Sequence, residues 1–138
     1  MFEETVYRFR LEERPWTVNA ERSGNRWERA KKVKHWRGRF NDLCGTEQRI
    51  VLTDAVVEVF TELKGRLQDT SACLPAVKAA IDGLVDGGLF LDDTGEHIRA
   101  IVFHAPTKAD GDALVIQISG RTLAEGVYTQ PKSTTEEM

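Results

Sequence analysis

The alternation of hydrophobic and polar residues along the chain predicts four β-strands. Residues 5–11 and 55–63 are rich in β-branched and aromatic side chains, which favour a strand. Residues 98–103 and 113–118 form two further apolar runs. Because a glycine-containing connection joins these last two runs, they are predicted to pair as a hairpin.

Two other segments have the spacing of helices. Residues 26–43 contain no proline, and their apolar side chains recur every three or four positions, which predicts a helix with a narrow apolar stripe. A second helix is expected to begin near Pro75, whose missing N–H costs nothing in a first turn. It is expected to end at Gly87-Gly88, which suits a left-handed terminus. Residues 15–25 are rich in turn formers and predict a loop.

The predicted order of elements is β-α-β-α-β-β. Such an order indicates an α+β domain with a mixed four-stranded sheet and helices packed on one side of it. A chain of 138 residues has the usual size of one domain. We assign the domain to residues 1–120 and expect residues 121–138, which are polar and lack periodicity, to be a partly disordered tail.

Composition favours a cytoplasmic protein. The chain is 41% hydrophobic and 30% charged, as is ordinary for globular proteins. No apolar run approaches the ~20 residues that span a bilayer, and residues 1–15 lack the basic start and apolar stretch of a signal peptide. Cys44 and Cys73 have no CxxC spacing, so reduced thiols in the cytoplasm are expected.

The net charge of −3 conceals a basic segment in the first predicted helix. Only Glu28 opposes its cations, which are Arg26, Arg29, Lys31, Lys32, Lys34, Arg37 and Arg39. A local positive field of this kind attracts an anionic partner such as nucleic acid. A simple solvated helix face is the alternative interpretation.

Residues 78–93, KAAIDGLVDGGLFLDD, resemble the second helix and following turn of the RusA family of Holliday-junction resolvases. That family has Lys-Ala-(Ala or Val)-apolar-Asp-x-Leu, a glycine-containing stop, and then apolar-x-Asp-Asp. The matching residues here are Lys78, Asp82, Leu84, Gly88, Asp92 and Asp93. Pro15-x-Thr17-x-Asn19 is similar to the family's Pro-x-Ser-x-Asn, and the order of strands agrees over about residues 5–118.

The resemblance implies a homodimer that binds four-way DNA junctions and cuts them in recombination, repair or phage DNA processing. It also implies Mg²⁺ (or Mn²⁺) held by carboxylates, which activates water and neutralises developing charge. Asp93 matches the third metal-binding aspartate, and Asp92 precedes it as in the family. Lys78 matches the functional lysine, which can stabilise the developing anion. Lys78 and Asp93 are therefore the expected catalytic residues.

The family's Asp-x-Asp-Asn motif is missing, because Ala72 and Leu74 stand where its two aspartates are expected. Neither side chain can bind a hard cation. Asp69 lies three residues upstream in the preceding loop, so Asp69, Asp92 and Asp93 are the expected metal ligands. The alternative for Asp69 is a helix or turn cap, and for Asp92-Asp93 it is a plain turn before a strand.

The resemblance also implies that basic residues of the first helix hold DNA phosphates. The candidates are Arg26, Arg29, Lys32, Arg37 and Arg39. Trp27 and Trp36 are expected to pack rather than to stack on bases. The three histidines lack the spacing of a metal site and are interpreted as structural or exposed. A metal-dependent endonuclease is the preferred interpretation; a degenerate RusA-like module that binds DNA or protein is the alternative.

Overall fold

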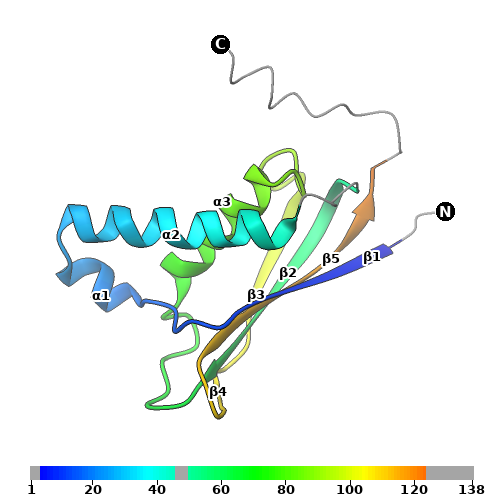
Figure 1. The fold of residues 1–138 in the computed structure, drawn as a ribbon. Coiled ribbons are helices and arrows are strands. Elements are labelled where there is room, and N and C mark those ends of the chain that lie inside the picture. The colour runs from blue at the N-terminus through cyan, green and yellow to red at the C-terminus, as the bar shows by residue number, and fades with distance from the viewer. Residues whose placement is uncertain (1–3, 46–49, 124–138) are drawn as a thin grey trace.

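The computed structural model of the protein describes residues 4–45 and 50–123. The described chain is an α+β structure in which the four predicted long strands and both predicted helices are present (Figure 1). In chain order the elements are β1 (Glu4–Leu11), α1 (Val18–Ser23), α2 (Arg26–Cys44), β2 (Leu52–Leu63), α3 (Leu74–Asp86), β3 (Ile98–Phe103), β4 (Thr107–Lys108) and β5 (Ala113–Thr122).

The strands form one mixed sheet of five strands in the order β1-β5-β2-β3, with the short β4 pairing to the end of β2. β5 is antiparallel to both β1 and β2, whereas β3 and β4 are parallel to β2. The predicted hairpin between β3 and β5 is therefore wrong, because β2 lies between these strands. In the segment between β3 and β5, β4 pairs with the last residues of β2. β5 then pairs with the opposite edge of β2.

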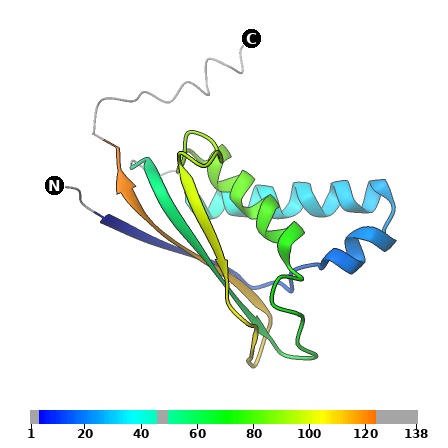
Figure 2. The same cartoon turned by 180° about the vertical axis from the view of Figure 1, so that it is seen from behind.

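The helices lie together on one side of the sheet, as Figures 1 and 2 show from opposite directions. Side chains that alternate along β2, among them Val57 and Val59, are almost completely buried, while those between them are half-buried. Such alternation is typical of a strand with one covered face. Phe40 of α2 and Leu84 of α3 are fully buried in the same core.

Helix α1 lies within residues 15–25, which the sequence predicted to be a loop. This six-residue helix begins after Thr17, whose Oγ1 accepts a hydrogen bond from the Ala20 N–H at 3.2 Å. Its backbone is also tied to the start of α3, because the Val18 N–H donates to the Ala72 carbonyl at 2.9 Å. A cap and a tertiary contact thus stabilise a helix too short to show periodicity.

The second predicted helix ends as expected in a left-handed glycine, which is Gly88 with φ of 93°. β5 continues to Thr122, two residues into the predicted polar tail. Residues 124–138 of that tail lie outside the described residues. Among the helices of residues 4–45 and 50–123, none is both long and apolar enough to cross a membrane.

Candidate functional site

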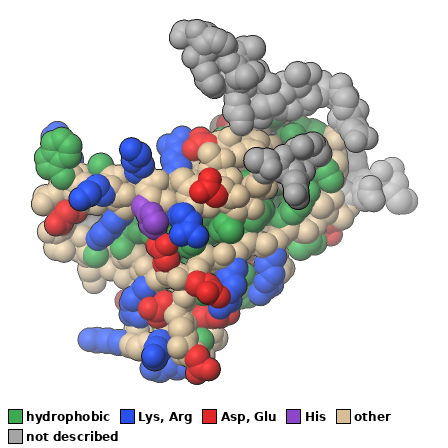
Figure 3. Space-filling view, viewed as in Figure 1, with side chains coloured by type: hydrophobic (Ala, Val, Ile, Leu, Met, Phe, Trp, Pro, Cys, Tyr) green, Lys and Arg blue, Asp and Glu red, His purple; other side chains and the backbone are tan. Residues whose placement is uncertain are grey.

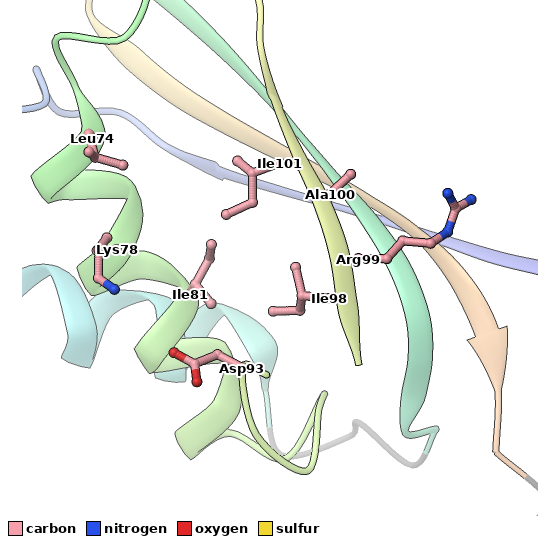
Figure 4. Close-up of a pocket in the computed structure, with 8 residues that line it drawn as sticks. All are labelled: Leu74, Lys78, Ile81, Asp93, Ile98, Arg99, Ala100 and Ile101. Carbon is pink, nitrogen blue, oxygen red and sulfur yellow. The ribbon is translucent and has the colours of Figure 1, made fainter. Parts of the chain in front are cut away.

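A hollow of about 370 Å³ lies between helix α3 and the edge strand β3 (Figure 4). Figure 4 shows Ile98 and Ile101 of β3 turned toward α3, and Arg99 and Ala100 turned away from it. The hollow is lined by Leu74, Lys78, Ile81, Asp93, Ile98, Arg99, Ala100 and Ile101. It therefore has an apolar floor with a few charged groups.

Lys78 and Asp93, the two expected catalytic residues, both line this hollow. Lys78 extends from the exposed side of α3, and Asp93 lies in the turn that leads to β3. In Figure 4 the two side chains point into the same space from these two elements. No ion pair joins them among the described residues, so both charged ends are available to a ligand in the hollow.

Asp92, the residue before Asp93, is engaged in the turn itself. Its Oδ1 accepts hydrogen bonds from the Thr94 N–H at 2.9 Å and from the Thr94 hydroxyl at 2.6 Å. These bonds, the hydroxyl's first, lower the pKa of Asp92 below its usual value. The turn interpretation of Asp92 is thus correct, whereas Asp93 faces the hollow.

Asp69 neither lines the hollow nor caps α3 through its side chain. The residue at the N-terminus of α3 is Cys73, which makes no side-chain cap bond, and Pro75 occupies the first turn. The chain before the helix is instead held by backbone turns, in which the Ala72 N–H donates to the Asp69 carbonyl at 3.0 Å. Asp69 thus supports the turn through its main-chain carbonyl, and the alternative interpretation of its side chain as the cap of α3 is wrong.

The carboxylates do not form the three-ligand metal site that the sequence suggested. Within residues 4–45 and 50–123 no three His, Cys, Asp or Glu side chains lie close enough together to hold a metal ion. Leu74, which stands where the RusA resemblance led us to expect an aspartate, contributes an apolar wall to the hollow. Mg²⁺ prefers near-octahedral oxygen ligands. The described residues offer it Asp93 alone in this hollow, and they do not fit a preformed site.

His97 joins the turn that carries Asp93 to the first residues of β2. Its side chain is buried, and its Nδ1 lies 3.0 Å from Thr53 Oγ1. Its Nε2 is 4.0 Å from Asp92 Oδ1. Its backbone carbonyl accepts from the Ala55 N–H at 2.8 Å. The structural interpretation of this histidine is confirmed.

Arg99, which the sequence did not single out, borders the hollow, but its side chain turns away from α3 toward Asp54. It is the extra residue at a bulge where β2 and β3 change register. Its Nε lies 3.1 Å from Asp54 Oδ1, and Asp54 also contacts Arg121 at 3.4 Å. Asp54 has φ of 53°, an uncommon conformation for a residue other than glycine. The pairing of β2 with β3 on one edge and with β5 on the other brings these charges together.

The basic residues of α2 divide into two sets. Three of the predicted DNA ligands contact other parts of the protein. Arg37 makes a two-pronged contact with Asp86 of α3 at 2.5 and 2.9 Å, which raises the pKa of Arg37. Arg39 lies 3.1 Å from Glu13, and Arg29 donates to the Gly24 carbonyl at 2.6 Å. These contacts fix α2 against its neighbours.

The other cations of α2 project from the helix without such contacts. No ion pair or hydrogen bond links the side chains of Arg26, Lys31, Lys32 or Lys34 to another described residue. Figure 3 shows basic side chains along this helix. Arg26 and Lys32 therefore remain candidates for phosphate contacts, joined by Lys31 and Lys34.

The two tryptophans of α2 have opposite environments. Trp36 is 4% exposed and packs between Trp16 and Phe40, as predicted. Trp27 is 78% exposed, so the expectation that it packs against the protein is wrong. Its position beside Arg26 leaves an aromatic surface next to a cation. Such a pair can contact a nucleic-acid base and its phosphate.

The sequence matches none of the models of known protein families, and no curated protein is significantly similar to it.

Proposed function

We propose that this chain is a RusA-like, structure-selective endonuclease of branched DNA. The observation that carries the proposal is the meeting of Lys78 and Asp93 in one hollow. These residues come from different elements, and both match positions of the RusA-like pattern in residues 78–93. A phosphodiester at this position would have the Lys78 ammonium beside its developing negative charge.

Binding of the DNA is assigned to α2. Its uncontacted cations carry charge that no described carboxylate neutralises. Phosphate contacts by such residues make affinity fall steeply with salt. Trp27 adds an exposed ring to this surface. A homodimer, which the family resemblance implies, would present two such surfaces to the arms of a junction.

A divalent ion is part of the proposal although the described carboxylates do not form a site for it. Mg²⁺ is commonly bound by one or two carboxylates together with substrate phosphates and water. Asp93 would then be the protein's ligand, with the remaining ligands supplied from outside the chain. Mn²⁺ accepts the same oxygen ligands and is the natural second ion for an assay.

The test is cleavage of a synthetic four-way junction by the full chain in Mg²⁺ or Mn²⁺. We expect paired cuts near the branch point. Asp93→Asn should abolish them, and Lys78→Met should slow them by about 10²-fold or more, the scale of losing one group that stabilises charge in the transition state. Asp110→Asn and Lys64→Met, which change exposed residues away from the hollow, are the matched controls. Absence of cutting by folded wild-type protein in either metal would refute the enzyme proposal.

A second candidate is a RusA-like module that binds branched DNA without cutting it. The observation that favours it is Leu74, an apolar side chain in the hollow at a position where the family has a metal ligand. Gel-shift titrations with four-way and linear duplexes at several salt concentrations separate the two candidates. Salt-dependent preference for the junction without cleavage would support the binding module. Absence of DNA binding would exclude both and favour a protein-interaction role.

A further inference from the structure

A second hollow, of about 390 Å³, lies between α3, α2 and the start of α1. Most of its wall is apolar, and among the described residues that line it Lys78 and Asp82 of α3 carry charge. It is lined by Trp16, Val18, Val33, Leu74, Pro75, Lys78, Ala79 and Asp82. Its volume falls within the range typical of small-molecule sites.

Lys78 and Leu74 line both hollows, so the two adjoin along α3. A ligand whose anionic group contacts Lys78 in the first hollow therefore has an apolar space next to that contact. A nucleotide has this composition, because a charged phosphate is joined through a sugar to a flat base with apolar faces. The Asp82 carboxylate is a hydrogen-bond acceptor at the wall of the same space.

The exposed charge on α2 supports a nucleotide over an apolar peptide. Arg26 lies seven positions before Val33, about two helical turns, which places it on the side of α2 that faces this hollow. Arg37 lies on the same side of α2 and forms an ion pair with Asp86, the last residue of α3. Arg26 has no ion-pair partner among the described residues. Its charge would attract a phosphate next to a nucleotide held here.

We infer that this second hollow binds the base of one nucleotide that has left the stack at the branch point of the DNA. Its phosphate lies at Lys78, its base between Val33 of α2 and Ala79 of α3, and a base amino group donates to Asp82. The inference rests on the proposed binding of branched DNA and adds to it a base-binding site. Unstacking costs least where pairing is already interrupted, as at a junction.

The experiment uses four-way junctions with 2-aminopurine, a fluorescent base quenched by stacking, at successive positions near the branch point. Binding is done without divalent metal so that no cutting occurs. We expect a severalfold rise in fluorescence at one position on addition of the full chain. Val33→Phe, which fills the hollow, should remove the rise. Gly38→Phe adds the same ring to α2 where nothing lies within 4 Å of the new Cβ, and it should leave the rise intact.

Asp82 is tested by removing one amino group from the DNA. Replacing adenine by purine at the responding position should weaken binding about tenfold, the cost of one hydrogen bond to a charged group. In Asp82→Ala the preference for adenine over purine should disappear. In Asp82→Asn, which keeps an acceptor oxygen, part of that preference should remain. These surface variants of α3 give a second readout if Val33→Phe fails to fold.

The outcomes separate the two proposals. Junction binding with no fluorescence rise at any position overturns the base site and leaves the proposed DNA binding intact. A rise that persists in Val33→Phe also overturns the site, because the base then unstacks elsewhere. No binding of wild-type protein to the junction refutes both. Displacement of the base signal by an apolar peptide, with DNA still bound, would assign the hollow to a peptide instead.

Discussion

Replacing Gly83 by alanine has two opposite effects on stability. The added methyl group disturbs the packing of α3 on α2, whereas alanine is the better helix former. A Cβ on Gly83 would lie 2.2 Å from the Arg37 carbonyl oxygen and 3.0 Å from the Phe40 Cβ. The oxygen belongs to the backbone and cannot rotate away. The two helices would have to separate by roughly 1 Å or more to restore van der Waals contact.

The expected cost follows from two opposing terms. Alanine is favoured over glycine inside a helix by about 1 kcal/mol, whereas forced overpacking costs about 1–3 kcal/mol and occasionally more. Because the clash is with the backbone, the cost lies at the upper end, and Gly83→Ala should lose about 2 kcal/mol. For a chain of this length that lowers Tm by about 6–10 °C.

Urea denaturation followed by circular dichroism measures this difference at constant m-value. Gly38→Ala is the matched control, because a Cβ at Gly38 in the exposed face of α2 meets nothing within 4 Å. It should stabilise the protein by about 0.5–1 kcal/mol. If Gly83→Ala proved as stable as Gly38→Ala, the close approach of the two helices would be refuted.

Three further predictions concern charge and reactivity. Replacing Arg26 and Lys32 together by alanine should reduce the slope of log affinity against log salt for duplex DNA by about 1.8, and an unchanged slope would exclude them as phosphate ligands. Thr94→Val should raise the pKa of Asp92 toward its usual value in a ¹³C NMR titration. Above its ordinary pKa this carboxylate stabilises the folded protein, and that contribution is lost as the pH falls. The contribution should be smaller in Thr94→Val. An unmoved pKa would contradict the hydrogen bonds. Burial raises the pKa of the Cys73 thiol, so it should react with iodoacetamide slowly in folded protein and rapidly in urea; equal rates would show that it is not buried.

The long elements followed from local patterns. β2 and α3 have periodic apolar side chains, and α3 carries its own start and stop residues, Pro75 and Gly88. α1 was missed because a six-residue helix is too short for periodicity to show. Its signal was Thr17, a capping residue three positions before the N–H that it accepts from.

The wrong strand pairing has a different cause. A strand's apolar pattern shows which side chains are buried but not which strand lies beside it. Only the two-residue β4 separates β3 from β5 in sequence, yet β3 and β5 each bond to β2 in the sheet. The twelve-residue β2 is long enough to pair with β3, β4 and β5 along its two edges, and that arrangement buries it at the centre.

The sequence by itself determined the α+β class and the basic character of α2, because each depends on the type and spacing of residues near one another. The choice of Lys78 and Asp93 came from the resemblance to the RusA family and stays a prediction. Only the tertiary structure decided which charges act together. It joined Arg37 and Arg39 to carboxylates from other elements and left Arg26 and Lys32 without such contacts. It brought Lys78 and Asp93 to one hollow while keeping Asp69 outside it. Such groupings depend on how helices and strands pack across long sequence separations, and local spacing carries no record of that packing.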